Sequence, residues 1–420
     1  MAGLGGPARR GRRTERTLLD PPAGTDMIRT LDDLDADGSA LGVRVDINSP
    51  LAEGGLADDA RLRAHVDTLE ELCRRGARVA VLAHQGRPGG GEFTDLSAHA
   101  ARLDDLVEPP VAYCDATFTA AARAAVADLE AGSAVLLENT RFYSEEYMEF
   151  EPAAAAETYL VDRLAPALDG YVNDAFATAH RAQPSIVGFP AALPAYAGRV
   201  MERELEVLGN IAESPEPRVF VLGGAKVDDS IDVARSVLDR GLADAVLTAG
   251  IVGNAFLLAD GVSLGAASAG VVNERSHGAV KAAGDLLDDF SHRLYLPRDV
   301  AVERDGDRVE VDLGGLPAAE PAMDVGARTL AAYADILEDA GTAILNGPPG
   351  VFEDERFEVG TRELYQAATR AETSVVGGGD TAAAMRQLGI EGFDHVSTGG
   401  GAALRMLSGE PLPGVEVLRG

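Results

Sequence analysis

The sequence has few cysteines and lacks any long apolar segment. Its two cysteines, Cys73 in a predicted helix and Cys114 after a predicted strand, show neither a disulfide framework nor metal-ligand spacing. Their scarcity favours a reducing compartment, the cytoplasm, and inert, half-buried thiols. No stretch approaches the roughly 20 uncharged apolar residues that a membrane helix needs, which indicates a soluble protein.

The first 26 residues lack the apolar core of a secretory signal. They carry five arginines, but no apolar segment follows these residues. We therefore expect residues 1–26 to form a disordered basic extension, with Met27 as the true start of the protein. A transit peptide is the alternative interpretation, although the segment has little serine and no amphipathic pattern.

Positive charge is scarce, and lysine is scarcer still. The chain has 37 basic against 68 acidic residues, a net charge of -31, which would repel nucleic acids and anionic membranes. An anionic ligand must therefore find a local basic pocket. Only two of the basic residues, Lys226 and Lys281, are lysines. This bias is typical of adaptation to high salt or of a GC-rich genome, so a lysine that persists suggests a specific need for an ammonium group.

The pattern of apolar segments predicts two α/β domains. A length of 420 residues suits two domains with a cleft between them. Short strands rich in Val, Leu and Ala alternate with amphipathic helices, which is typical of doubly wound parallel (Rossmann-like) sheets. A helix near residues 199–210, after a proline-rich passage, is the expected hinge. The predicted strands are 41–47, 77–83, 133–137, 170–173, 218–222, 245–248, 342–345 and 374–376, with an antiparallel excursion over 294–313 around the turn Asp305-Gly306.

The second half of the chain contains four glycine-rich loops that are expected to follow strands and open helices. Glycine lets a ligand approach the backbone, and helix N-termini present free N–H groups to phosphate oxygens. A single such loop usually reflects turn geometry alone, but four favour a phosphate cradle. None matches the Walker pattern. The loops are Gly223-Gly224-Ala225-Lys226, Asn346-Gly347-Pro348-Pro349-Gly350, Gly377-Gly378-Gly379-Asp380-Thr381 and Ser397-Thr398-Gly399-Gly400-Gly401.

Three side chains in or near these loops could contact a nucleotide. Lys226 is either an ordinary surface lysine or a phosphate-directed ammonium, and the rarity of lysine favours the second interpretation. Asp380 could cap a helix, bind nucleotide-borne magnesium, or do both. Glu353 could bind ribose hydroxyls, although an exposed glutamate in an acidic protein needs no such role.

The first half of the chain places basic residues after apolar strands. Ligands of open parallel sheets bind beyond the carboxyl ends of the strands, so these loops could converge on a small, multiply charged anion. Each arginine alone could equally form a surface ion pair. The recurrence across several loops favours a binding site made from Arg44-Val45-Asp46-Ile47-Asn48, Arg61, His84-Gln85-Gly86-Arg87-Pro88, Arg141 and His180-Arg181.

Together these motifs, in this order, resemble the phosphoglycerate kinase family from Met27 to the end of the chain. The resemblance rests on residues 44–50, 84–88, 173–182, 223–227 and 346–353 and on the two late triple-glycine motifs. It implies that phosphoglycerate is held by Asp46, Asn48, Arg61, His84, Arg87, Arg141 and Arg181, with His180 nearby. It also implies that ATP or ADP is held by Gly223, Gly224, Lys226, Asn346, Glu353, Gly377, Gly378, Gly379, Asp380 and Thr381.

The resemblance further implies a mechanism and a domain plan. Arg61 and Lys226 would be catalytic, Asp380 would bind Mg²⁺, and Gly399, Gly400 and Gly401 would form a phosphate loop. The expected domains are a phosphoglycerate-binding domain over 27–195, a nucleotide-binding domain over 196–400 and a segment over 401–420 that returns to the first domain. We expect a cytoplasmic monomer that closes about its hinge.

Two departures from the family and three alternative functions need a test. Ser230 stands where many members have a second lysine, and Leu345 stands where the family has a tryptophan; the first departure and the lysine-poor surface resemble the archaeal, halophilic branch. The alternatives are a kinase for another carboxylate, a non-catalytic nucleotide-binding protein that kept the fold, and a two-lobed solute-binding protein. For a solute-binding protein we would expect a signal segment, which this sequence does not show, and the glycine loops would be unexplained.

Overall fold

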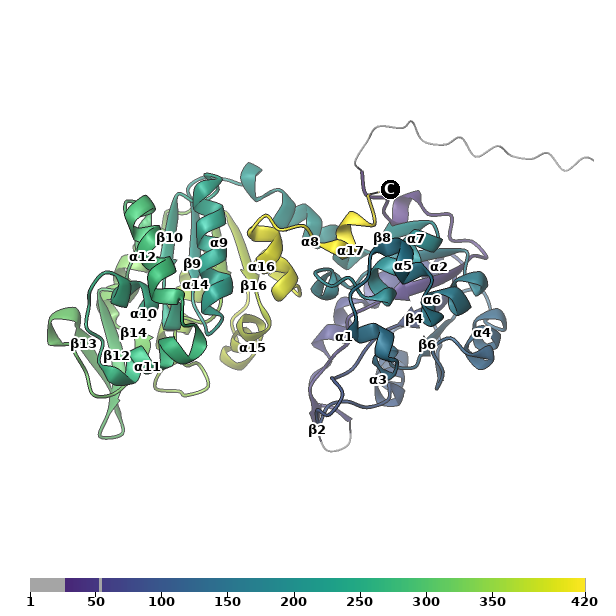
Figure 1. Ribbon diagram of the computed structural model, residues 1–420, viewed down its shortest axis with the longest axis horizontal. Helices are drawn as coiled ribbons and strands as arrows, with labels where there is room; N and C mark the ends of the chain where they lie inside the picture. Colours follow the sequence, from purple (N-terminus) through teal and green to yellow (C-terminus); the bar gives the residue numbers. More distant parts are fainter. Residues whose placement is uncertain (1–26, 53–54, 420) are drawn as a thin grey trace, which may run out of the picture.

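The computed structural model describes residues 27–52 and 55–419 and forms two lobes joined by a narrow waist (Figure 1). The first lobe contains a six-stranded sheet in the order β5-β6-β4-β1-β7-β8, and all of its strand pairs are parallel. Its strands are β1 (Ala40–Arg44), β4 (Arg78–Leu82), β5 (Val111–Cys114), β6 (Ala134–Leu137), β7 (Gly170–Asn173) and β8 (Ala195–Ala197). A small antiparallel pair, β2 (Leu51–Ala52) and β3 (Gly55–Leu56), lies apart from this sheet.

Helices cover the sheet of the first lobe. They are α1 (Ala60–Ala64), α2 (Val66–Arg74), α3 (Ser97–Leu106), α4 (Ala120–Ala127), α5 (Pro152–Ala156), α6 (Tyr159–Leu164) and α7 (Phe189–Ala192). Short helical turns join them: η1 (Leu31–Asp33), η2 (Thr140–Phe142), η3 (Ser144–Tyr147), η4 (Ala165–Ala167), η5 (Phe176–Thr178) and η6 (Pro184–Gly188).

The second lobe repeats the architecture. Its parallel sheet has the order β11-β10-β9-β15-β16-β17. The strands are β9 (Arg218–Leu222), β10 (Ala245–Thr248), β11 (Leu294–Tyr295), β15 (Thr342–Asn346), β16 (Thr373–Gly377) and β17 (His395–Ser397). The helices are α9 (Val227–Asp239), α10 (Gly250–Ala259), α11 (Ala266–Arg275), α12 (Ala279–Phe290), α13 (Ala327–Glu338), α14 (Val359–Ala368), α15 (Gly379–Leu388) and α16 (Gly401–Leu407), with the turns η7 (Ile211–Glu213) and η8 (Leu313–Gly315). Two α/β lobes with parallel sheets confirm the predicted fold class.

The predicted antiparallel excursion is confirmed. Strands β12 (Asp299–Arg304) and β13 (Asp307–Asp312) form a hairpin, and β14 (Ala322–Val325) pairs with β12 on its other side. The two turn residues, Asp305 and Gly306, have φ angles of 55° and 90°. Both angles are positive, as a two-residue hairpin turn requires, which explains the Asp-Gly pair.

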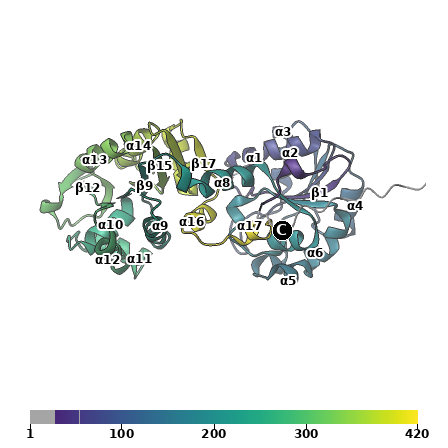
Figure 2. The ribbon, with the colours of Figure 1, turned by 90° about the horizontal axis from the view of Figure 1, so that it is seen from above.

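Two segments connect the lobes. Helix α8 (Arg199–Gly209) leads from the first lobe into the second, and the chain returns through α16 to α17 (Pro413–Glu416), which lies on the first lobe (Figure 2). There the Gly414 amide donates to the Ala179 carbonyl over 2.8 Å. Asn173 Nδ2 donates to the Gly414 carbonyl over 3.3 Å. The end of the chain is therefore part of the first lobe, as the resemblance implies.

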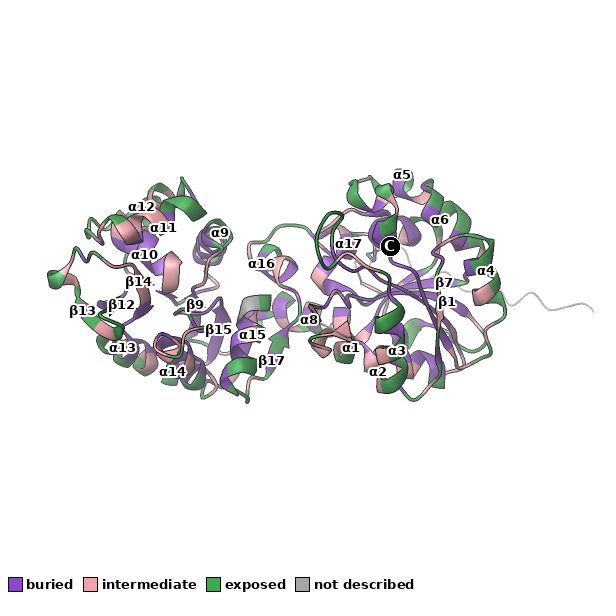
Figure 3. Cartoon of the chain, turned by 90° about the horizontal axis from the view of Figure 1, so that it is seen from below, coloured by how far each residue is buried: buried purple, intermediate pink, exposed green. Residues whose placement is uncertain are grey.

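The sheets lie in the buried cores of both lobes, and the helices that cover them are exposed along their outer faces (Figure 3). Every residue of β1, β9, β10 and β15 is buried. In α9 the side chains of Val227, Ile231, Ala234 and Leu238, which recur at helical spacing, are buried as well. In the part of the chain described by the structure, no helix is long and apolar enough to cross a membrane.

Two local predictions are wrong in an informative way. The strand predicted over 41–47 ends at Arg44, because the chain leaves the ladder there to enter the site described below. The helical spacing of Leu62, Val66, Leu69 and Leu72 suggests a single helix, but α1 ends at Ala64 and α2 begins at Val66. The buried side chain of His65 turns inward at this break and forms hydrogen bonds there.

Candidate active site

The carboxyl ends of four parallel strands carry the predicted site residues of the first lobe, most of which are basic. Asp46 and Asn48 follow β1, His84 and Arg87 follow β4, Arg141 follows β6, and His180 and Arg181 follow β7. Because these strands are neighbours in a parallel sheet, their carboxyl ends lie along the same edge. Arg61 reaches this edge from α1.

Hydrogen bonds bring these residues together. Arg61 forms an ion pair with Asp46. Asn48 accepts a hydrogen bond from the Gly86 amide over 2.8 Å, and Arg141 donates to the Gly86 carbonyl over 2.7 Å. The loop after β4 is thus held between the loops after β1 and β6, while Arg87 itself stays exposed.

Crowding of positive charge shifts the titration of this cluster. Burial and the nearby Arg181 and Arg44 lower the pKa of Arg141 to about 10. Burial, opposed in part by Asp46, lowers the pKa of Arg181. Burial and then Arg181 lower the pKa of His180 to about 4. Burial is the main cause of each shift and neighbouring arginines add to it, so a bound anion that offsets the buried positive charge would be favoured.

Fully buried Arg44 determines which ring nitrogen of His84 can donate a hydrogen bond. Arg44 Nη2 lies 2.9 Å from His84 Nδ1, and a guanidinium can only donate. Nδ1 must therefore accept, which leaves the proton of the neutral ring on Nε2. Burial, followed by the charge of Arg44, lowers the pKa of His84 well below its usual value, so the ring stays neutral. His84 can thus offer an N–H group to an anion in the cluster.

Glycines pack three loops of the second lobe against one another. The Gly223 amide donates to the Asn346 carbonyl over 2.8 Å, and the Gly224 amide donates to the Pro348 carbonyl over 2.9 Å. A Cβ on Gly223 would lie 2.8 Å from the Pro348 carbonyl oxygen, so only glycine allows this approach. The Gly347 amide donates to the Thr381 hydroxyl over 3.0 Å. Thr381 therefore ties the loop after β15 to α15.

A cavity of about 250 Å³ opens beside these loops. Its lining includes Gly224, Gly350 and the predicted Glu353. It also includes Gly250, with φ of 58°, at the turn from β10 into α10, a residue that the glycine motifs did not reveal. A lone glycine between a strand and a helix was the available signal. The cavity suits the base and sugar of a nucleotide, with phosphates directed toward the glycine loops.

Three of the four glycine loops open helices as predicted, and one does not. Helices α9, α15 and α16 begin at the ends of their loops, whereas α14 begins at Val359, well beyond the Asn346–Gly350 loop. The Asn346–Gly350 loop instead supplies carbonyls that accept hydrogen bonds from the loop after β9. Lys226 precedes α9 and is exposed. Asp380 is the second residue of α15, after the cap Gly378; its side chain lies outside the described part of the structure.

Residues from both lobes line a second cavity of about 450 Å³. Asn48 and Arg61 face it from the first lobe, and Gly378, Gly379 and Thr398 face it from the second. Beyond Thr398 the late triple-glycine loop packs against the first lobe, because a Cβ on Gly399 would lie 2.4 Å from the Phe176 ring. This cavity therefore brings Asn48 and Arg61 of the first lobe to the start of α15 in the second, whereas Gly224 and Glu353 line the separate cavity of about 250 Å³.

Comparison with known proteins identifies the family of this two-lobed arrangement. A family model described as phosphoglycerate kinase matches residues 31–410. The chain belongs to the phosphoglycerate kinase family. It is 80% identical over 395 residues to the phosphoglycerate kinase of Natronomonas pharaonis, covering 94% of this chain and all of that protein. It is 62% identical to the enzyme of Halobacterium salinarum, covering 93% of this chain and all of that protein.

A solved structure of the family has the same fold. The crystal structure of phosphoglycerate kinase from Pyrococcus horikoshii OT3 matches with a TM-score of 0.88 and 40% identity, covering 93% of this chain and 98% of that one. The relatives from halophilic archaea agree with the resemblance to the halophilic branch of the phosphoglycerate kinases. Ser230, the departure from the family's second lysine, is buried in α9 and leaves Lys226 without a second ammonium one turn away.

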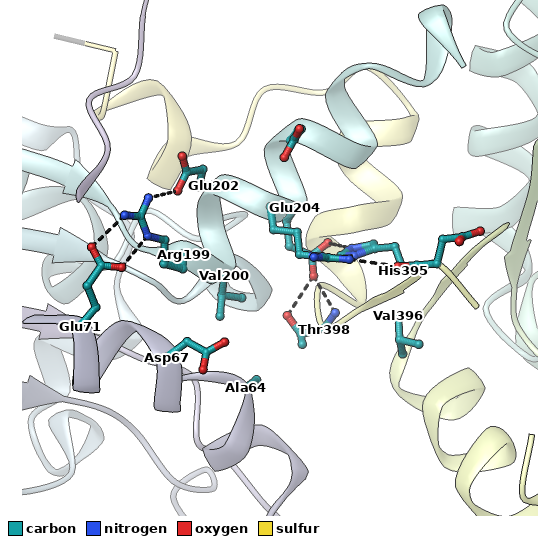
Figure 4. A pocket seen from close by; sticks show the side chains of 13 residues that line it. Ala64, Asp67, Glu71, Arg199, Val200, Glu202, Glu204, His395, Val396 and Thr398 are labelled. Atoms are coloured by element: carbon teal, nitrogen blue, oxygen red, sulfur yellow. Dashed lines mark hydrogen bonds and ion pairs between the residues drawn. The ribbon is translucent and has the colours of Figure 1, made fainter. Parts of the chain in front are cut away.

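Another cavity at the hinge, of about 570 Å³, has a different character (Figure 4). Carboxylates dominate its lining, among them Asp67, Glu71 and Glu202. Its Arg199 is already paired, at 2.8 Å from Glu71 and 2.7 Å from Glu202. Because these carboxylates repel anions, this cavity is poorly suited to a phosphorylated ligand.

Proposed function

We propose that the chain is a phosphoglycerate kinase, which reversibly transfers a phosphoryl group from 1,3-bisphosphoglycerate to ADP and yields 3-phosphoglycerate and ATP in glycolysis and gluconeogenesis. The observation that carries this proposal is the interdomain cavity, lined by Asn48 and Arg61 on one lobe and by Gly378 and Gly379 at the glycine-rich start of α15 on the other. Membership of the family supports the same assignment.

The basic cluster holds the phosphoglycerate. Arg61, Arg141 and Arg181 provide guanidinium groups that bind carboxylate and phosphate oxygens, and His84 adds a neutral N–H donor. Asp46 orients Arg61 through their ion pair. Asn48, Arg87 and His180 complete the site at its rim. The acyl phosphate is already a good donor to ADP, so the ATP-forming direction requires no general base.

The glycine loops hold the nucleotide and stabilise the transferred group. Negative charge spreads over the equatorial phosphoryl oxygens in the transition state, and Lys226, Arg61 and the N-termini of α9 and α15 would neutralise it. Among the described residues no group of three His, Cys, Asp or Glu side chains could hold a metal. A nucleotide-borne Mg²⁺ needs fewer protein ligands, and Asp380 would supply one; the ion would neutralise phosphate charge.

Transfer requires the lobes to close. The two substrates bind on different lobes, and the connections between the lobes are α8 and the α16–α17 segment. Closure about these segments brings the substrates together and excludes water that would hydrolyse the acyl phosphate. We propose a monomeric, cytoplasmic, salt-adapted enzyme, because bending between lobes gains little from a fixed interface and the surface carries excess negative charge.

A coupled assay tests this function. The chain, in multimolar KCl with Mg²⁺ and ATP, should phosphorylate 3-phosphoglycerate and should not act on glycerate, which lacks the phosphate that the basic cluster selects. Equal turnover of glycerate or acetate would indicate a kinase for another carboxylate. Binding of ADP without any turnover would indicate a non-catalytic nucleotide-binding protein.

A further inference from the structure

His65 lies at the break between α1 and α2, behind the basic cluster. The residue is only 3% exposed. Nδ1 is 2.6 Å from a carboxylate oxygen of Asp174, and Nε2 is 3.1 Å from the backbone amide of Asp46. One buried ring therefore contacts both the loop after β1 and the loop after β7. The proposed function assigns it no part.

Asp174 also holds the start of the hinge helix. Its second carboxylate oxygen accepts from the Val200 amide, in the first turn of α8, over 2.9 Å. The packing is tight, because a Cβ on Gly198 would lie 2.1 Å from this oxygen. A carboxylate is favourable at a helix N-terminus, where free N–H groups carry partial positive charge. Asp174 therefore links His65 to the element on which the lobes turn.

The partners of the ring decide where its proton lies. A carboxylate can only accept, so Nδ1 carries the proton and donates to Asp174. In the neutral ring Nε2 then has a free lone pair, which accepts from the Asp46 amide. A doubly protonated ring would lose this bond and could donate only to the Asp46 carbonyl, 3.2 Å away.

We propose that His65 is a positioning residue for phosphoglycerate binding. By accepting a hydrogen bond from the Asp46 amide, His65 holds the residue whose carboxylate orients Arg61. By donating to Asp174, it also fixes the position of Asp46 and Arg61 relative to the N-terminus of α8. This inference rests on the proposed function, because Asp46 and Arg61 are taken to hold the substrate. The residue acts through Asp46 and does not itself touch the substrate.

Two variants distinguish the hydrogen bond of His65 with Asp174 from its hydrogen bond with the Asp46 amide. Asparagine in H65N can donate to Asp174 but does not reach the Asp46 amide. Glutamine in H65Q can place its oxygen where Nε2 lies and accept from that amide. Because H65N leaves a buried amide without an acceptor, we expect its KM for 3-phosphoglycerate to rise about 10-fold. The same KM should change less than about twofold in H65Q, and the KM for ATP should change less than about twofold in both variants.

Two measurements test whether His65 positions Asp46 through Nε2. Kinetics at saturating ATP should show the split between H65N and H65Q, and ¹⁵N NMR of the unmodified chain should find the His65 proton on Nδ1 with Nε2 unprotonated. Equal KM values in both variants, a parallel rise in both substrates' KM values, or a proton on Nε2 would each overturn the inference. A chain that shows no kinase activity at all would refute the proposed function, while the NMR result would still report on the bonds of the ring.

Discussion

A buried histidine on α3 should make the stability of the protein sensitive to acid. His99 on α3 is fully buried and lies 3.0 Å from the Gln85 side chain. Burial lowers the pKa of His99 to about 4. The unfolded chain takes up this proton as pH falls below about 6.5, whereas the folded chain resists until about pH 4. Stability contributed by His99 is therefore present above pH 6.5 and lost between pH 6.5 and 4.

Replacing His99 should reduce this acid sensitivity. Between pH 7 and pH 4.5, urea unfolding of the unmodified chain should lose about 2 kcal/mol more free energy than unfolding of the H99Q variant. The exposed His292→Gln change serves as the control and should leave the pH dependence as it is. Identical pH profiles for H99Q and the unmodified chain would show that His99 does not resist protonation.

At the same scale, the sequence predicts residue types better than their roles. The basic residues after β4, β6 and β7 are visible in the sequence because each group follows an apolar strand. Arg44 is visible too, but its complete burial and its contact with His84 depend on tertiary packing. His65 has no local signal at all, because helical periodicity continues through it and its partners lie in distant loops.

Helix α8 is attached to both lobes, and this makes it the element that controls their relative position. Asp174 holds its first turn to the first lobe. Farther along, buried Glu204 accepts from the amide and the hydroxyl of Thr398, over 2.7 and 3.0 Å, and lies 3.0 Å from His395 (Figure 4). These contacts join the helix to β17 and to the loop before α16.

Weakening this attachment should destabilise the protein. The E204Q variant loses one carboxylate oxygen as an acceptor in a buried site, so we expect the free energy of unfolding to fall by about 1–3 kcal/mol. The E206Q variant changes an exposed glutamate on the same helix and should shift the free energy of unfolding by less than about 0.5 kcal/mol. Equal effects in denaturant unfolding would mean that Glu204 does not hold the hinge.

The sequence predicts elements well where patterns are long or chemically specific. The Asp305-Gly306 hairpin is correct because its turn requires positive φ angles. The length of the loop between β15 and α14 is missed, because its glycines and prolines serve contacts with the neighbouring loop after β9 and not a helix start. Such contacts between loops leave no periodic signal in the sequence.

The whole molecule carries excess negative charge, and its stability should depend on salt. A net charge of -31 opposes the compact state by self-repulsion. Screening lengths fall from about 10 Å at 0.1 M salt to about 3 Å at 1 M. We therefore expect the melting temperature to rise by roughly 5–10 °C between 0.1 and 2 M KCl, and by less in sucrose of equal osmolality. A constant or falling melting temperature would contradict this expectation.

The central claim is that an ammonium on the second lobe completes phosphoryl transfer to or from a substrate held on the first. The most direct test is the rate of Mg²⁺- and ATP-dependent phosphorylation of 3-phosphoglycerate by the K226A variant beside the unmodified chain, with K226R as the control that keeps the charge. We predict that kcat falls about 10²- to 10³-fold in K226A and less in K226R. Unchanged turnover in K226A would contradict the account.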